Sequence, residues 1–187
     1  VFEQDHKQKV REAKMAEIES EPKHDMKHTA PKSRPTKEIN NAYRKADMAF
    51  AKGDFEEAEK MFIKVLALDD AYVDANLKLG VVYLQKGESA KAEFFFSKLL
   101  VTKKDPLFFS NLALALYQQK RLPEAAEAYE KAISLDPRKE GRFVSLAHVY
   151  RELGNEEKAL TNMERAAQLA PRNTEYLFVL VDGYVMQ

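Results

Sequence analysis

Small side chains recur along the chain at a nearly constant interval from Ile39 onward. One set, whose members lie about 34 residues apart, comprises Ala46, Gly80, Ala113 and Ala147. A second set follows twelve positions after the first and comprises Ala58, Ala92, Ala125 and Ala159. Four positions further on, the residues are large and apolar, namely Phe62, Phe96, Tyr129 and Met163. This repeat predicts an array of helix-turn-helix units, each of which buries its apolar face against its neighbours.

Within each unit the apolar positions recur every three or four residues, which is the period of a buried helical stripe. A turn between the two helices is predicted where glycine precedes a polar residue, at Gly53-Asp54, Gly87-Glu88 and Gly154-Asn155. Glycine there permits the left-handed end of the first helix, and Asp or Asn can cap the second helix. The third unit has Lys120 at this place, so we expect its turn to differ or to carry strain.

The unit ends are predicted from proline, which stops the second helix. Three ends have proline, namely Asp105-Pro106, Asp136-Pro137 and Ala170-Pro171, and the first unit is expected to end at Asp69-Asp70, which has none.

The first 38 residues differ in composition from the repeats. They are rich in charged residues and proline, and they cannot bury enough apolar surface to offset the entropy of ordering. Charge pairs four residues apart between Glu3 and Glu21 favour a solvated helix, whereas Pro22 to Thr36 is typical of a linker. We therefore expect a charged N-terminal segment, residues 1–38, that is largely disordered or a solvated helix, followed by a repeat domain, residues 39–187.

Charge and cysteine content exclude several classes of protein. The 30 Lys and Arg residues balance the 30 Asp and Glu residues, so the chain offers no basic footprint for nucleic acid. No apolar run approaches the roughly 18 residues of a membrane helix, so we expect a soluble segment without direct membrane insertion. The absence of cysteine excludes disulfides, thiolate zinc sites and a cysteine nucleophile. Two localisations stay open: cytoplasmic, or tethered through an N-terminal anchor that precedes this sequence.

The stretches Leu79 to Phe96 and Glu124 to Pro137 resemble tetratricopeptide repeats (TPRs). The resemblance implies an all-α fold, a right-handed TPR superhelix (α-solenoid) of four full helix-turn-helix repeats plus a partial fifth. The implied repeats are residues 39–72, 73–105, 106–139, 140–173 and 174–187. The first repeat departs from the family pattern, with Ala42 where an aromatic residue is usual and Lys45 in place of Leu.

Pentatricopeptide repeats, which read RNA and have a similar period, are the alternative family. The neutral charge and the Asp-Pro endings of the units favour TPR.

The family resemblance assigns the concave surface to the first helix of each repeat. The residues expected to line a partner-binding groove there are Tyr43, Phe50, Leu77, Val81, Leu84, Ser110, Asn111, Leu114, Tyr117, Val144, His148, Arg151 and Phe178. Such a groove is mostly apolar at its centre and polar at its ends, and it fits an amphipathic helix or an extended apolar segment. The alternative is that part of this stripe is core or is covered by the chain's own tail.

One specialised TPR function is a clamp for the C-terminal carboxylates of chaperones, which the family builds from Lys, Asn and Arg side chains. Only Asn111 fits at the matching positions of this sequence. A carboxylate would then enter an apolar groove without a cationic partner, which is costly. We therefore do not expect a carboxylate clamp.

Catalytic motifs are absent from the sequence, which has no phosphate-binding glycine loop, no nucleophile elbow and no HExxH pair. His24 and His28 stand four apart and would share a helix face, but no third metal ligand lies near them, which favours a solvated pair. We expect no enzyme activity, no catalytic residue, no metal and no cofactor.

The leading hypothesis is a non-enzymatic protein-protein interaction scaffold that binds a partner peptide or helix in its apolar concave groove. The alternative is a self-assembling structural TPR module. It would form a homo-oligomer through the open C-terminal end, where no second helix follows Glu175 to Gln187, or through Phe94 on the convex face.

The repeat phase makes a prediction for Ala92, which is expected at a close helix-helix contact. Ala92→Leu should overpack this contact and lower the free energy of unfolding by about 1 to 3 kcal/mol. Chemical denaturation measures the change, and unchanged stability would contradict the assigned phase.

Overall fold

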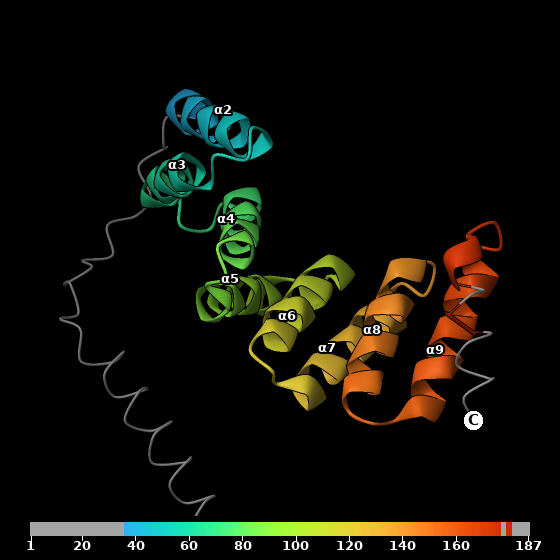
Figure 1. The fold of residues 1–187 in the computed structure, drawn as a ribbon. Helices are drawn as coiled ribbons and strands as arrows, with labels where there is room; N and C mark the ends of the chain where they lie inside the picture. Colours follow the sequence, from blue (N-terminus) through green and yellow to red (C-terminus); the bar gives the residue numbers. More distant parts are fainter. Residues whose placement is uncertain (1–35, 177–178, 181–187) are drawn as a thin grey trace, which may run out of the picture. The chain divides into compact units, whose positions relative to one another are not determined.

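The computed structural model describes residues 36–176 and 179–180, and Figure 1 shows that this part of the chain is built of successive helices. The chain divides into two units, residues 1–34 and 35–187, and every described helix belongs to the second. The predictions for residues 1–35, including the pair His24 and His28, lie outside the described residues. The first described helix begins at Thr36, inside the stretch that we expected to be a linker.

Eight helices follow one another from residue 36 to residue 169, further helical residues lie at 174–176 and 179–180, and the described residues contain no strand. They are α2 (Thr36–Ala51), α3 (Phe55–Leu68), α4 (Val73–Gln85), α5 (Ser89–Thr102), α6 (Pro106–Gln118), α7 (Leu122–Leu135), α8 (Glu140–Glu152) and α9 (Glu156–Leu169). The even-numbered helices are the first helices of the repeats, and each packs against the odd-numbered second helix that follows it. Each second helix also packs against the next first helix, which confirms the all-α fold of helix-turn-helix repeats.

The small residues of the sequence pattern lie where two helices approach each other. Both sets of alanines have side chains that are 0% exposed, namely Ala46, Ala58, Ala92, Ala113, Ala125, Ala147 and Ala159. The large residues that follow are buried as well, and Phe62 and Phe96 are each 0% exposed. The predicted repeat phase therefore gives the core positions of all four repeats.

The turn between the two helices of a repeat has the same left-handed backbone in all four repeats. Gly53 and Gly87 have φ of 75°, and Gly154 has φ of 73°. Lys120 adopts φ of 59°, although a side chain disfavours this region by about 1 kcal/mol or more. The third turn thus keeps the shape of the others and carries the strain that was expected.

Two of the second helices are capped as predicted. The Asp54 carboxylate accepts a hydrogen bond from the Glu57 backbone N–H at 3.1 Å, and the Asn155 side-chain oxygen accepts one from Lys158 at 3.0 Å. Glu88 makes no side-chain cap bond to α5, because its longer side chain forms ion pairs with lysines instead.

The prediction that Pro106 stops the second helix of its repeat is wrong. The helix α5 ends at Thr102, and Pro106 is the first residue of α6. Proline is tolerated there because the first turn of a helix has no internal partner for its N–H groups. The Asp105 carboxylate caps this helix by accepting from the Leu107 N–H at 2.9 Å.

The first repeat ends without proline, and a buried amide orders its last turn. Asn76 on α4 is 1% exposed, and its Nδ2 donates to the carbonyl oxygens of Asp70 and Tyr72, at 2.9 Å each. These bonds fix the chain between α3 and α4.

Tyrosine-glutamate bonds join consecutive repeats. The Tyr83 hydroxyl on α4 donates to Glu59 on α3 at 3.0 Å, and the Tyr150 hydroxyl on α8 donates to Glu130 on α7. Burial, followed by the bond to the carboxylate, raises the pKa of both tyrosines to about 12. Each bond crosses the boundary between two repeats, so it supports stacking rather than the fold of one repeat.

The contact between Gly80 and Phe96 gives a second stability prediction. A Cβ atom on Gly80 would lie 2.6 Å from Cε1 of Phe96, whose ring is enclosed in the core. Gly80→Ala should therefore lower the free energy of unfolding by about 1 to 3 kcal/mol in urea denaturation.

Gly141→Ala is the matched control, because Gly141 also lies in a first helix but a Cβ atom there would meet nothing within 4 Å. This change should leave stability equal or raise it by about 0.5 to 1 kcal/mol. Equal effects of the two substitutions would contradict the packing argument.

Candidate partner-binding surface

Apart from Phe178, the predicted groove residues lie on the first helices α2, α4, α6 and α8. We call their exposed and half-buried side chains the first-helix surface. Its centre lies on α6, where Leu107 is 48% and Leu114 is 37% exposed. These two residues are seven apart and so share one face of the helix. On α4, Leu77 and Val81 are half-buried and pack against the core.

Leu84 does not belong to this surface, and its assignment to the groove is wrong. Its side chain is only 6% exposed, and it lies in one core cluster with Phe108 and Ala115 of α6. The two first helices α4 and α6 contact each other directly. Leu84 therefore fills space between helices and is not accessible to a partner.

Tyr43 and Phe50 of α2 are half-buried, and a lysine from the next repeat covers both rings. The Lys78 ammonium lies 5.6 Å from the ring centroid of Tyr43 and 5.5 Å from that of Phe50. It also donates a hydrogen bond to the Asp47 carboxylate. Burial by itself lowers the pKa of Lys78, but the bond to Asp47 and the negative groups around it raise the pKa overall. At the α2 end of the first-helix surface, Lys78 therefore covers the two aromatic rings, and its bond to Asp47 fixes its position.

Sequence reasoning missed the covering role of Lys78. The signal available in the sequence was its place on α4 about one repeat after Asp47, which puts the two residues on neighbouring first helices.

A second polar cluster joins α6 to α8. The Tyr117 hydroxyl donates to one oxygen of Glu152, and the Lys120 ammonium lies 3.2 Å from the other. Lys120 also lies 5.5 Å from the centroid of the Tyr117 ring. The bond from Tyr117, and then that from Lys120, lower the pKa of Glu152, and the same carboxylate raises the pKa of Tyr117. The strained residue Lys120 is thus part of a network on the first-helix surface.

Arg142 fixes the chain that enters α8. Its Nη1 donates to the carbonyl oxygen of Asp136 at 2.7 Å and to the carboxylate of Asp136 at 3.1 Å, and its Nε donates to the Ser110 hydroxyl at 3.1 Å. Ser110 in turn donates to the carbonyl oxygen of Pro106 at 2.8 Å. The predicted groove residue Ser110 is therefore engaged in a structural bridge between α6 and α8, which the sequence pattern did not indicate.

The remaining predicted residues lie apart from these clusters. Val144 is half-buried on α8, whereas His148 and Arg151 are exposed there. The Asn111 side chain donates to the carbonyl oxygen of Leu107 at 2.9 Å, within its own helix. Phe178 lies outside the described residues.

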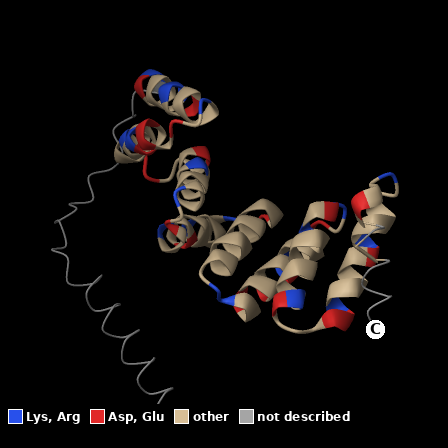
Figure 2. Ribbon diagram, viewed as in Figure 1, with Lys and Arg blue, Asp and Glu red and all other residues tan. Residues whose placement is uncertain are grey.

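Charge is absent from the middle of the first-helix surface. The helix α6 is the only described helix without Asp, Glu, Lys or Arg, and Figure 2 shows it free of blue and red. No group of three or more His, Asp or Glu side chains in the described residues is arranged to hold a metal ion. None of the described helices is both long and apolar enough to cross a membrane. What this surface offers to a partner is an apolar strip between two polar clusters.

Comparison with known proteins identifies the family. Models of the tetratricopeptide repeat match residues 49–113, 106–139 and 143–173. The chain belongs to this family, as its sequence pattern indicated. Repeats of this family generally mediate protein-protein interactions and scaffolding, and the family is in general non-catalytic.

The chain is similar to curated proteins of varied function. It is 34% identical over 126 residues to a TPR repeat-containing protein of Treponema pallidum, a match covering 66% of this chain and 15% of that protein. It is 24% identical over 131 residues to anaphase-promoting complex subunit 3 of Schizosaccharomyces pombe, covering 70% and 20%. A third relative, SPINDLY of Hordeum vulgare, is 29% identical over 132 residues, covering 70% and 14%, and its name is that of a peptide N-acetylglucosaminyltransferase. The chain thus spans a quarter or less of these relatives.

Solved structures share the fold. A crystal structure of MamA has a TM-score of 0.72 at 24% identity, covering 78% of this chain and 80% of that one. A thermophilic TPR protein of Thermus thermophilus has a TM-score of 0.64 at 20% identity, covering 79% and 82%. At these identities the likeness shows the helical solenoid alone.

The cluster at Glu152 predicts a measurable pKa change. Tyr117→Phe removes the hydroxyl that donates to Glu152, so the pKa of Glu152 should rise toward its ordinary value in a carboxyl NMR titration. Since the folded-state pKa is depressed, the cluster stabilises the protein above the unfolded-state pKa, and this contribution is lost as pH falls through the folded-state pKa.

Tyr150→Phe is the matched control, because that hydroxyl donates to Glu130 and not to Glu152. It should leave the pKa of Glu152 at the wild-type value. A Tyr117→Phe titration identical to the wild type would disprove the bond.

Proposed function

We propose that this chain is a non-enzymatic interaction module whose first-helix surface binds an apolar segment or an amphipathic helix of a partner protein. The observation that carries the proposal is the uncharged helix α6, with Leu107 and Leu114 exposed on one face. Exposed leucines on a helix without charge are costly in water, and a partner that covers them is stabilised by the apolar area removed from solvent.

The polar clusters beside this strip support a defined position for the ligand. One cluster, Lys120 with Glu152, lies beside Tyr117 at the end of α6. In the other, Lys78 is paired with Asp47 and lies over the rings of Tyr43 and Phe50 on α2. Each charge already has a partner within the chain, so the clusters favour a ligand that is apolar where it meets α6 and polar at its ends.

The test begins by identifying the partner with a photo-crosslinker placed at Leu114 and continues with the purified partner fragment. Leu107→Glu combined with Leu114→Glu puts two charges on the α6 face and should weaken binding by about a hundredfold in calorimetry. Both side chains are at least one third exposed, so the double variant is expected to fold.

The control is Ile63→Glu combined with Leu135→Glu, which changes two residues of similar or greater exposure on the second helices α3 and α7. It should bind as the wild type does. Full binding by a folded Leu107 and Leu114 variant would refute the proposed surface.

A second candidate function is self-assembly through the outer face of α5. Phe94 is 63% and Val101 is 85% exposed, and they are seven residues apart on one face of the helix. The Phe94 ring packs edge-on against Phe95, with 5.3 Å between the centroids. Exposed aromatic and aliphatic side chains in line are typical of an interface.

Self-assembly predicts a mass that rises with concentration in light scattering. Phe94→Ser combined with Val101→Ser should abolish the rise, because the apolar contact is removed. Monomeric behaviour of the wild type at every concentration would exclude this second candidate.

A further inference from the structure

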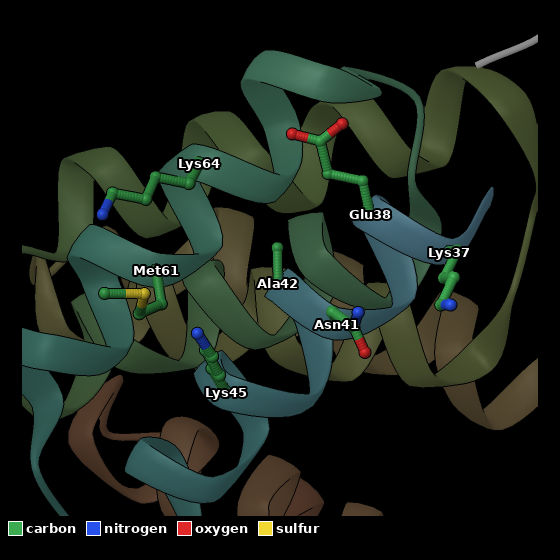
Figure 3. Close-up of a pocket in the computed structure, with 7 residues that line it drawn as sticks. All are labelled: Lys37, Glu38, Asn41, Ala42, Lys45, Met61 and Lys64. Atoms are coloured by element: carbon green, nitrogen blue, oxygen red, sulfur yellow. The ribbon is translucent and has the colours of Figure 1, made fainter. Parts of the chain in front are cut away.

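A depression of about 550 Å3 lies between α2 and α3, away from the α6 strip. Figure 3 shows its side chains, with Lys37, Asn41 and Lys45 on α2, and Met61 and Lys64 on α3. The ammonium groups of Lys45 and Lys64 lie on either side of Met61 in this view. The depression therefore combines an apolar floor with two flanking cations.

Two residues that line the depression, Ala42 and Lys45, differ from their counterparts in the third and fourth repeats. Ala42 lies four residues before the first small residue, where the third and fourth repeats have Phe109 and Phe143. An alanine in place of phenylalanine leaves space between the helices. Lys45 stands where the fourth repeat has Leu146, which is 3% exposed. Ala42 thus leaves space for the recess, and Lys45 adds a positive charge to its lining.

Within the described residues, the lysines of this recess have no ion-pair partner. In the described part of the chain, Lys37, Lys45 and Lys64 form no ion pair, and Glu38, the one acidic residue of the lining, pairs with none of them. Elsewhere, Lys78 and Lys86 each contact a carboxylate. The lining thus holds three lysines and one glutamate, and this excess of positive charge favours an anionic ligand.

We propose that this recess binds an acidic segment of a partner protein, with carboxylates on Lys45 and Lys64 and an apolar side chain against Met61. Charge complementarity favours an anionic occupant, and the apolar floor favours a peptide over a phosphate backbone. The cations lie in one recess rather than along a stripe, and no aromatic ring lines it for base stacking, which disfavours nucleic acid. This site is independent of the surface on α6.

The experiment uses two labelled decapeptides, EELEELEELE and its neutral counterpart QQLQQLQQLQ, in fluorescence anisotropy with the full chain at low salt. The acidic peptide should bind and the neutral one should not. Lys45→Glu combined with Lys64→Glu should weaken binding by about tenfold or more. Ala42→Phe should weaken it by a similar factor while leaving every lysine in place, because it fills the recess with the residue that two other repeats carry.

The matched charge control is Lys52→Glu combined with Lys104→Glu, which makes the same change in net charge at two exposed lysines outside the recess. It should retain the affinity of the wild type. A loss equal to that of the Lys45 and Lys64 variant would mean non-specific attraction and would overturn the proposal.

Two further outcomes also overturn it. One is unaltered binding by Ala42→Phe, since the recess would then play no part. The other is loss of the acidic peptide in a Leu107→Ser and Leu114→Ser variant, which adds no charge, since this loss would place the peptide on α6.

Discussion

The close approach of helices at small residues is the constraint on which the rest of this structure depends. Gly80 has no room for a methyl group beside Phe96, and alanines with no exposed surface occupy the equivalent contacts in the other repeats. Helices this close leave space for one large side chain between them, which Phe62 and Phe96 fill. The repeats therefore pack in the same way, and this packing sets which helix faces remain outside the core.

The helix faces that lie outside the core differ in charge and exposed apolar surface from one first helix to the next. On α2 the rings of Tyr43 and Phe50 are covered by Lys78, so apolar surface there is already partly shielded within the chain. On α6 no charged residue is present, and Leu107 and Leu114 have no such cover. A partner gains the most free energy where uncovered apolar surface faces water, which is why the proposed binding strip lies on α6. Lys120 keeps a strained backbone in a network beside this strip, which is consistent with strain being retained near a functional surface.

The first repeat differs from the later ones in the residues that it exposes beside α3. A leucine at the position of Lys45 is buried in the fourth repeat, whereas in the first repeat this position faces the depression beside α3. Lys45 is exposed, so its ammonium group stays in water, whereas a leucine there would expose apolar surface. Lys45, Lys64 and the small Ala42 also line a recess. Its lysines have no ion-pair partner in the described residues.

The sequence by itself determined the family, the repeat phase and the buried small residues, because small side chains can recur in phase with large ones only if every repeat packs in the same way. It also located the strained turn at Lys120, since every other turn has glycine there. Tertiary structure decided which side of each first helix is accessible. It placed Leu84 in the core and Lys78 over two aromatic rings, and it brought Ser110 into a hydrogen bond with Arg142. The physical reason is that these outcomes depend on contacts between neighbouring repeats, whereas the sequence period reports only the packing that all repeats share.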